Sequence, residues 1–259
     1  MTKQSVFFFD IDGTLLNGEK KLPASTKESI FKLKEAGHIV AIATGRAPFM
    51  YEDLRKELEI NTYISYNGQY VVLEGEVLYT NPLNMDELIR LTEIAKANEH
   101  PVVFMDHDDM KANVPEHTYI TESISTLRID RFPTHDPYYY RGRDLYQSLL
   151  FCMEGEEKPY ESEFKAFDFV RWHPYSVDIL PRGGSKAKGI EKVVEKLGIA
   201  KENIYAFGDG LNDIEMLSAV HHGIAMGNGE EKAKQAARYV TLSVEEDGIS
   251  YGLKKLGLL

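Results

Sequence analysis

The sequence predicts an α/β fold whose core is a Rossmann-like parallel sheet, interrupted once by an inserted α/β domain. Two observations lead to this prediction. Near both ends of the chain, short and continuously apolar runs alternate with segments whose apolar residues recur at helical spacing. Between about residues 82 and 182 this alternation stops, and it then resumes. Strands that alternate with helices imply parallel strands joined by right-handed crossovers.

The composition of the 259 residues is that of a globular protein, with 43% hydrophobic and 27% charged residues. A net charge of −11 argues against nucleic acid or an anionic membrane as a partner. No apolar run is long enough to span a membrane, and no basic-then-apolar leader begins the sequence. The single cysteine, Cys152, cannot form an internal disulfide. We therefore expect a cytoplasmic protein, a monomer or small homo-oligomer, with no membrane partner.

The first core segment contains two predicted strands, each followed by a helix. Residues 6–9 and 39–43 are apolar runs of the kind that a strand buried on both faces requires. A helical pattern begins after Pro23 and stops at Gly37. A second helix is expected over residues 48–58. Three short strands then follow over residues 62–65, 70–73 and 77–79; the Asn-Gly and Glu-Gly pairs between them favour antiparallel hairpins.

The middle of the chain reads as an inserted module with its own sheet. Its predicted elements are helices near 85–97 and Tyr160, strands near 102–105, 149–153, 166–171 and 177–180, and an irregular stretch over 128–143. The predicted division is therefore 1–81 for the first core segment, 82–182 for the insert and 183–259 for the second core segment.

Alternation returns after the insert. Ser185 begins a helix that Gly198 ends, and a strand over 204–207 runs into a second acidic stretch. Helices are expected around Met216 and over 230–237, with strands over 223–226 and 239–241. A final helix is expected from Gly248.

Two carboxylates follow the first predicted strand. Because strand side chains alternate, Asp10 and Asp12 leave the strand end on the same side. Their charges repel unless a cation or a proton relieves the repulsion. An alternative is that Asp-Ile-Asp-Gly forms only a turn, since Asp and Gly are common turn residues.

Further polar groups fall where strands end or helices begin. Thr44-Gly45 ends the second strand, Lys186 opens a helix, and Asp209, Asn212 and Asp213 follow a later strand. A hydroxyl, a lysine and several carboxylates together suit a phosphoryl group held beside Mg²⁺, which prefers oxygen ligands. No group of His and Cys residues has the spacing of a zinc site.

Four motifs resemble those of the haloacid dehalogenase superfamily, in order: Phe9-Asp10-Ile11-Asp12-Gly13-Thr14-Leu15, Ala43-Thr44-Gly45-Arg46, Ser185-Lys186 and Gly208-Asp209-Gly210-Leu211-Asn212-Asp213. The Asn67-Gly68, Ala225-Met226-Gly227-Asn228 and Asp247-Gly248 stretches are similar to the Cof-type subclass IIB. The resemblance covers nearly all of both core segments and is weak in the insert. It implies the fold of that superfamily, with the insert as a cap that closes over the core site and selects the substrate.

The resemblance also implies roles for the site residues. Asp10 is the nucleophile that forms an aspartyl-phosphate, and Asp12 is the general acid and base. Mg²⁺ is bound by Asp10, the Asp12 carbonyl and Asp209, while Asp213 places a water or Lys186. The phosphoryl oxygens are bound by Thr44, Gly45, Lys186 and Asn212. The expected activity is Mg²⁺-dependent hydrolysis of small phosphorylated metabolites, such as sugar phosphates, nucleotides or phosphorylated cofactors.

Several alternatives stay open at this stage. Lys188 lies two residues from Lys186 and could contact phosphate in its place. Asp213 could serve only the start of a helix. Cys152 is expected to be a small buried hydrophobe. The same nucleophile could also serve a phosphotransferase or a phosphomutase acting on sugar phosphates. A phosphate-ligand binding protein that kept the fold is a non-catalytic alternative.

Overall fold

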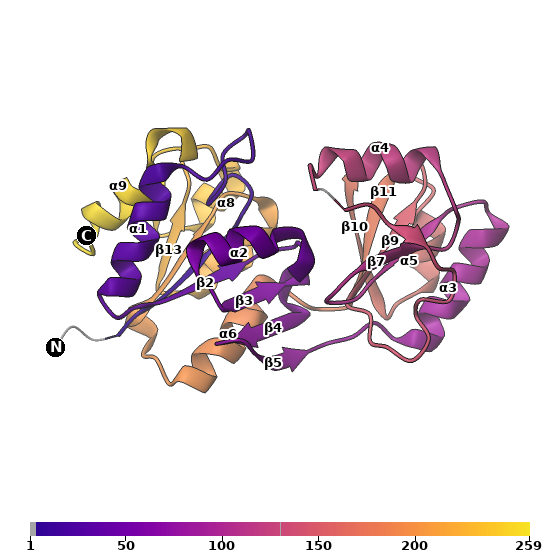
Figure 1. The fold of residues 1–259 in the computed structure, drawn as a ribbon, viewed down its shortest axis with the longest axis horizontal. Coiled ribbons are helices and arrows are strands. Elements are labelled where there is room, and N and C mark those ends of the chain that lie inside the picture. The colour runs from indigo at the N-terminus through magenta and orange to yellow at the C-terminus, as the bar shows by residue number, and fades with distance from the viewer. Residues whose placement is uncertain (1–3, 130) are drawn as a thin grey trace. The chain divides into compact units, whose positions relative to one another are not determined.

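The computed structural model describes residues 4–129 and 131–259, which form two compact units. The first, called the core unit below, consists of the residues up to Arg46 together with Glu52–Tyr79 and Ser185–Leu259. The second, called the cap unit, consists of Ala47–Tyr51 and Thr80–Gly184. Each unit has its own sheet (Figure 1). The mixed α/β class and the parallel-sheet core are confirmed.

The core unit contains an eight-stranded sheet in the order β14-β13-β12-β1-β2-β3-β4-β5. The strands are β1 (Val6–Phe9), β2 (Ile39–Ala43), β3 (Thr62–Ser65), β4 (Tyr70–Leu73), β5 (Glu76–Thr80), β12 (Ile204–Gly208), β13 (His222–Ala225) and β14 (Tyr239–Val240). Each neighbouring pair from β14 to β3 is parallel, and β4 is antiparallel to β3. The expected hairpin therefore extends a parallel sheet at one edge.

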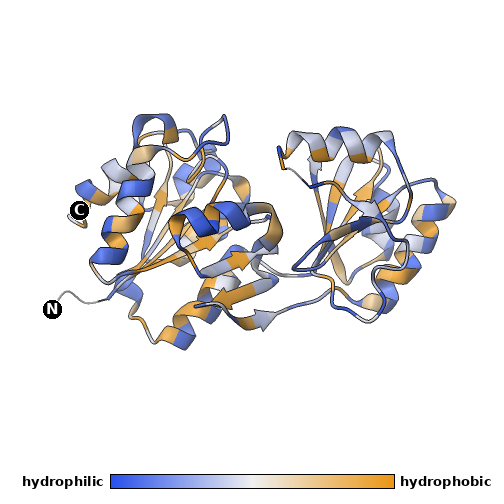
Figure 2. Ribbon diagram, viewed as in Figure 1, coloured by the Kyte–Doolittle hydropathy of each residue, from blue (hydrophilic) through white to orange (hydrophobic). Residues whose placement is uncertain are grey.

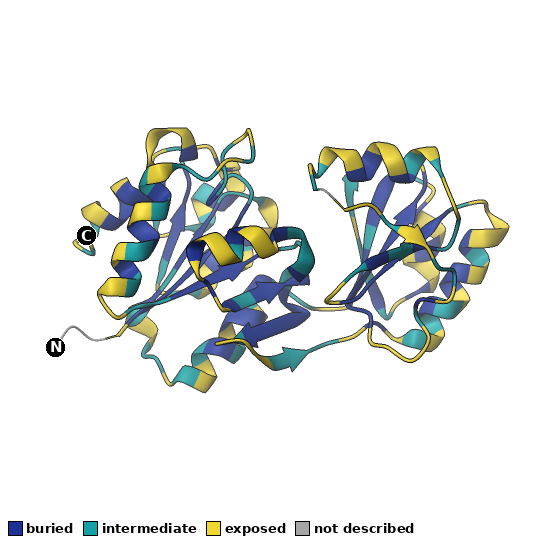
Figure 3. Cartoon of the chain, in the orientation of Figure 1, coloured by how far each residue is buried: buried dark blue, intermediate teal, exposed yellow. Residues whose placement is uncertain are grey.

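Helices cover both faces of this sheet. One face carries α1 (Ala24–Glu35), α2 (Glu52–Leu58) and α9 (Gly248–Lys255); the other carries α6 (Lys186–Leu197), α7 (Ile214–Ala219) and α8 (Glu231–Ala236). All four residues of β1 are fully buried, as a strand covered on both faces requires. The central strands are accordingly apolar in Figure 2 and buried in Figure 3.

The cap unit contains a six-stranded sheet in the order β10-β11-β9-β6-β7-β8. Its strands are β6 (Val102–Met105), β7 (Met110–Ala112), β8 (Thr134–His135), β9 (Gln147–Phe151), β10 (Phe167–His173) and β11 (Ser176–Pro181). Its helices are α3 (Met85–Ala97), α4 (Thr118–Thr126) and α5 (Lys158–Glu163). Side chains from α3 and α5 pack with Val102, Leu150 and Val177 on one face of the sheet. The other face carries the side chains that alternate with these.

Several elements differ from the sequence expectations. Between residues 106 and 127 no element was expected, whereas β7 and α4 lie there. The single helix expected over 48–58 is a 3₁₀ turn, Pro48–Tyr51, followed by α2. Helix α1, by contrast, begins directly after Pro23 as expected, and Pro23 occupies its N-cap position. A proline is tolerated at this end because the first N–H groups of a helix have no intrahelical partner.

Candidate active site

Three neighbouring parallel strands end at the same edge of the core sheet. Asp10 follows β1, Thr44 follows β2 and Asp209 follows β12. The Asp10 N–H donates to the Phe207 carbonyl at 3.0 Å, which extends the pairing of β1 and β12 to the start of the site. The chain leaves β1 for β2 on one side, while β12 lies on the other. Such a reversal of strand order opens a crevice at the carboxyl ends of the strands.

Lys186 connects two of the carboxylates at this edge. Its Nζ lies 2.6 Å from Asp10 Oδ1 and 2.6 Å from Asp213 Oδ1. The side chains of Lys186 and Asp213 are fully buried, and that of Asp10 is 9% exposed. A buried lysine between two carboxylates is stable because each charge has a partner. Lys188 is exposed and is absent from this cluster.

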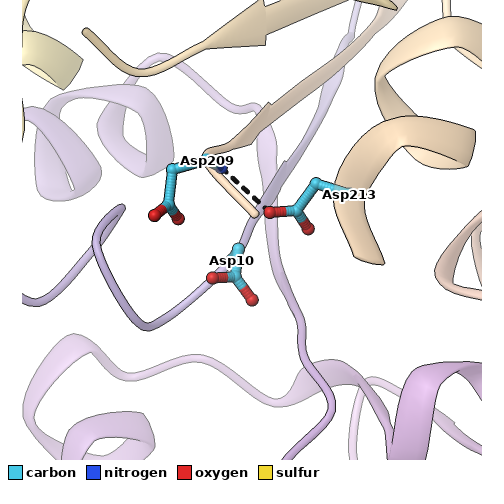
Figure 4. A group of neighbouring side chains, drawn as sticks. All are labelled: Asp10, Asp209 and Asp213. Carbon is cyan, nitrogen blue, oxygen red and sulfur yellow. Dashed lines mark hydrogen bonds between the residues drawn. The ribbon is translucent and has the colours of Figure 1, made fainter. Parts of the chain in front are cut away.

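Asp213 also fixes the loop that carries Asp209. Its second oxygen, Oδ2, accepts the Asp209 N–H at 2.9 Å (Figure 4) and also the Gly210 N–H at 2.8 Å. The Asp209 carboxylate is oriented separately, because Thr14 Oγ1 donates to its Oδ1 at 3.0 Å. Asp213 therefore uses both oxygens on protein groups, while Asp209 keeps one oxygen for another ligand.

The three carboxylates of Asp10, Asp209 and Asp213 fit a cation. Each offers an oxygen, and these atoms lie within 4.8 Å of one another. Burial raises the pKa of Asp10, against the opposing effect of Lys186, and Asp213 and Asp209 raise it further. Burial and then the Asp213 charge raise the pKa of Asp209 to about 6. Lys186 supplies one positive charge to three acids, so a hard dication with oxygen ligands would balance the rest.

Asp12 lies in a different environment. Arg46 forms two parallel hydrogen bonds with its carboxylate, from Nε to Oδ2 and from Nη2 to Oδ1, both at 2.7 Å. The Lys20 ammonium also donates to Oδ1. Although burial opposes the change, hydrogen bonds and charge from Arg46, and then from Lys20, lower the pKa of Asp12. Asp12 is therefore an ionised carboxylate in this arrangement.

The predicted phosphate-binding residues cluster around Asn67. Asn212 Nδ2 donates to Asn67 Oδ1 at 3.2 Å, and a Cβ added at Gly45 would lie 3.0 Å from Asn67 Nδ2. Thr44 is 2% exposed, and its hydroxyl oxygen accepts the Arg46 N–H at 3.1 Å, which leaves its O–H as a donor. The structure thus brings Gly45 and Asn212 to the Asn67 amide side chain, while the Asn67 N–H donates to the Thr44 carbonyl at 3.0 Å.

A turn before β4 positions the helix that carries Lys186. Gly68 has φ of +99°, and a Cβ there would lie 2.1 Å from the Ser185 carbonyl oxygen. Because glycine has no side chain, this turn can contact Ser185, the N-cap residue of α6. Ser185 caps α6 by accepting the Lys188 N–H. Close packing at Gly68 therefore sets where Lys186 enters the site.

Five site residues were absent from the predicted set: Thr14, Lys20, Arg46, Asn67 and Asn228. Asn228 joins two loops, since it donates to the Gly13 carbonyl and accepts the Val244 N–H. Four of the five fall within or beside the motifs quoted above. Lys20 gave no signal, because an isolated lysine after a turn is usually a solvated side chain.

The environment of Cys152 makes its thiol unreactive. Cys152 is fully buried, and burial raises the pKa of its thiol to about 11. It is therefore a poor nucleophile, as expected.

Among the helices that the structure describes, none combines the length and apolar character that crossing a membrane requires.

Comparison with known sequences identifies the family. A family model of haloacid dehalogenase-like hydrolases matches residues 7–253. The chain is 48% identical over 254 residues to YkrA of Bacillus subtilis, covering 98% of each chain. It is 32% identical over 267 residues to the 5-amino-6-(5-phospho-D-ribitylamino)uracil phosphatase YitU of the same organism, again covering 98% of each. It is 30% identical over 261 residues to the pyridoxal phosphate phosphatase YbhA of Escherichia coli, covering 95% and 96%.

Solved structures agree with this assignment. A protein from Geobacillus kaustophilus HTA426 has a TM-score of 0.96 and 54% identity, over 99% of this chain and 100% of that one. The subclass IIB sugar phosphatase BT4131 has a TM-score of 0.85 and 31% identity, with the same coverage. The chain belongs to the haloacid dehalogenase superfamily, in which it is a Cof-type phosphoric monoester hydrolase.

Proposed function

We propose that this protein is a Mg²⁺-dependent phosphatase of small phosphorylated metabolites, with Asp10 as its nucleophile. The observation that supports this most is the cluster of Asp10, Lys186, Asp209 and Asp213 beside the ends of β1 and β12, in which all but the half-buried Asp209 are buried. The relatives YitU and YbhA are named for phosphate esters of small molecules, which supports the substrate class.

The donor set favours Asp10 and Asp209 as the carboxylate ligands of the metal, with the Asp12 carbonyl as a third protein ligand. Asp213 already binds Lys186 and two backbone N–H groups, so it serves better to hold those groups in place. Bound there, Mg²⁺ would neutralise charge on the phosphoryl oxygens. A ligand set made only of oxygen atoms suits Mg²⁺, which fills its remaining coordination positions with waters and phosphate oxygens.

The first chemical step forms a bond between Asp10 and phosphorus. Lys186 holds Oδ1 of Asp10, which leaves Oδ2 to attack in line. The bond from phosphorus to the ester oxygen breaks, and a protonated Asp12 gives its proton to that oxygen. The Thr44 hydroxyl, the Gly45 N–H, Asn212 and the Lys186 charge bind the phosphoryl oxygens. Positioning and charge stabilisation of this kind supply most of the catalysis in phosphoryl transfer.

The second step releases the phosphate. A water attacks phosphorus, its proton passes to Asp12, and the bond to Asp10 breaks. The ion pairs with Arg46 and Lys20 stabilise the Asp12 carboxylate, which suits it as this base. The acid role in the first step requires Asp12 to leave those pairs and carry a proton. A general acid and base of this kind typically contributes about 10²- to 10⁴-fold.

Release of inorganic phosphate tests the proposal. The native protein, Asp10→Asn and Asp53→Asn are each incubated with a panel of phosphate monoesters, with Mg²⁺ and then with a chelator. Asp53 is exposed on α2, so its variant makes the same chemical change away from buried charge. We expect turnover by the native protein and Asp53→Asn with Mg²⁺ only. Turnover by Asp10→Asn would contradict the assigned nucleophile, and no turnover by any of them would contradict the function.

A further inference from the structure

A turn between β1 and α1, formed by residues 17–21, presents Lys20 to the candidate active site. The Lys20 N–H donates to the Asn17 carbonyl at 2.9 Å, and Asn17 Oδ1 accepts two further N–H groups of the turn, at 3.0 and 3.1 Å. Glu245 accepts hydrogen bonds from the Asn17 amide and the Gly18 N–H, at 3.2 and 3.3 Å. Lys20 has φ of +61°, which is strained for a residue with a side chain. These contacts therefore fix the backbone from which the Lys20 side chain extends.

The Lys20 ammonium has one partner among the described residues, the Asp12 carboxylate. It shares this carboxylate with Arg46, which donates two hydrogen bonds at 2.7 Å. The Lys20 side chain is 32% exposed, whereas that of Arg46 is 14% exposed. Lys20 also carries its charge on a flexible stem, while the guanidinium of Arg46 is a rigid fork. Lys20 is thus the partner that exchanges Asp12 for another anion more readily.

The next residue, Lys21, shows that the turn does not direct every cation inwards. Its ammonium lies 2.7 Å from Glu19 Oε2, and the two side chains are 75% and 69% exposed. An exposed ion pair of this kind contributes little to stability. The contact with Asp12 is therefore particular to position 20, and Lys21 offers a matched control on the same turn.

The position of Lys20 matters because of what happens beside Asp12. To give its proton to the ester oxygen, Asp12 must lie within about 2.6–3.2 Å of that oxygen. The ammonium already contacts the same carboxylate, so it and the ester oxygen become neighbours. As the bond to phosphorus breaks, its electron pair moves onto the ester oxygen. A cation there stabilises the transition state more than the bound substrate, which has less charge on this atom.

We propose that Lys20 is a catalytic residue, whose ammonium moves from Asp12 to the ester oxygen and stabilises the negative charge that develops on it. Lys20 keeps all its protons, and the proton that ends on the leaving group comes from Asp12. The exchange also removes one of the two ion pairs of Asp12, as its acid role requires. This role rests on the proposed function, in which Asp10 attacks phosphorus opposite the ester oxygen.

Binding of orthovanadate tests this contact without turnover. Vanadate accepts an additional oxygen ligand, so it imitates the transition state and places an oxygen where the ester oxygen leaves. With Mg²⁺ present, Lys20→Met should weaken vanadate binding about tenfold or more, as expected when a hydrogen bond to a charged group is lost. Lys20→Arg keeps the charge and should recover part of the affinity, and Lys21→Met should bind like the native protein. Titration calorimetry measures all four proteins.

A double-mutant cycle separates a direct contact from an effect that passes through Asp12. If Lys20 touches the leaving oxygen, Lys20→Met also weakens vanadate binding in a protein that carries Asp12→Asn. If Lys20 only holds Asp12, it changes nothing there. Binding that Lys20→Met leaves unchanged, in either background, would overturn the inference. The absence of vanadate binding by the native protein, or an equal loss in Lys21→Met, would do the same.

Kinetics add the dependence on the leaving group. Lys20→Met should lower kcat by a larger factor for the sugar phosphate that the native protein hydrolyses fastest than for p-nitrophenyl phosphate, whose ring spreads the charge of the leaving oxygen. Equal losses would place Lys20 on the phosphoryl oxygens instead and contradict the inference. The vanadate assay needs no turnover, so a protein that shows the expected binding and releases no phosphate contradicts the proposed function and not this contact.

Discussion

The Lys186 side chain sets the charge state of the residues around it. It is fully buried with two carboxylates at 2.6 Å, and although burial opposes this, Asp10 and Asp213 raise the pKa of its ammonium. Removal of this charge would leave two buried acids without the opposite charge that they share. That loss is more costly than the absence of the whole cluster would be.

Lys186→Met therefore should lower the free energy of unfolding by about 3–5 kcal/mol, the range for breaking a buried ion pair. It should also lower kcat by more than about 10²-fold, the scale seen when one group that stabilises transition-state charge is removed. Lys188→Met is the control, because that side chain is exposed on the same helix. Denaturant unfolding and phosphate release measure the two effects. Equal losses in both variants would contradict the geometry.

Asp178 makes stability depend on pH. Burial raises its pKa from 3.8 to about 7, so the folded chain binds this proton more tightly than the unfolded chain does. The contribution of protonated Asp178 to the free energy of unfolding is therefore full below about pH 4 and is lost as the pH rises through about 7. Asp178→Asn cannot ionise and avoids this loss.

We expect Asp178→Asn and the native protein to be equally stable near pH 4. Near pH 8 the variant should be more stable by about 2 kcal/mol, a value reduced for the partial exposure of the group. Denaturant titrations at the two pH values measure the difference. A gain that does not change with pH would show that the charge of Asp178 is not its cause.

At the scale of elements, the Gly68 turn positions α6. A left-handed residue with open space around it strains only its own backbone, whereas Gly68 also touches the Ser185 carbonyl. Gly75 provides the matched comparison, because its φ is +89° and nothing lies within 4 Å of an added Cβ.

Gly75→Ala should cost about 1–2 kcal/mol, the penalty of the left-handed conformation alone. Gly68→Ala should cost more and should also lower kcat, since α6 must move with Lys186. Thermal melts and phosphate release compare the two variants. If Gly68→Ala lost no more activity than Gly75→Ala, the contact with Ser185 would not be what places Lys186.

The sequence predicts the elements that follow periodic patterns and misses those that depend on distant pairing. Strands β1, β2 and β12 were expected because continuous apolar runs mark strands buried on both faces. Helix α4 was missed, since its sequence is rich in Thr, Ser and Ile, which favour other conformations. The strand order of the cap sheet depends on long-range pairing that no local pattern records.

Within the site, carboxylates at strand ends were predictable because the parallel sheet brings those ends together. Asp10 and Asp209 lie together for this reason. The ion pairs of Asp12 with Arg46 and Lys20 were not predictable, since they depend on the conformations of long, flexible side chains. Asn67 belongs to the Asn-Gly turn that the sequence predicts, with φ of +51°, but its contacts with Gly45 and Asn212 depend on long-range packing that no local pattern records.

At the scale of the whole molecule, we expect the binding of a dication to raise the stability of the fold and to be required for activity. If Mg²⁺ binds the folded chain and not the unfolded chain, it stabilises the fold by about 2.7 kcal/mol at a concentration 100 times Kd. We expect Mg²⁺ to raise Tm and a chelator to abolish turnover. Asp209→Asn should show neither the rise of Tm with Mg²⁺ nor Mg²⁺-dependent turnover, whereas Asp53→Asn should show both. A rise of Tm that persists in Asp209→Asn would place the ion elsewhere.

The most direct test of the central claim is mass spectrometry of protein quenched in acid during turnover. The account predicts that the peptide containing Asp10 gains the mass of one phosphoryl group, and that Asp10→Asn shows no such gain. A phosphoryl group on another peptide, or steady turnover by Asp10→Asn with no adduct, would contradict it.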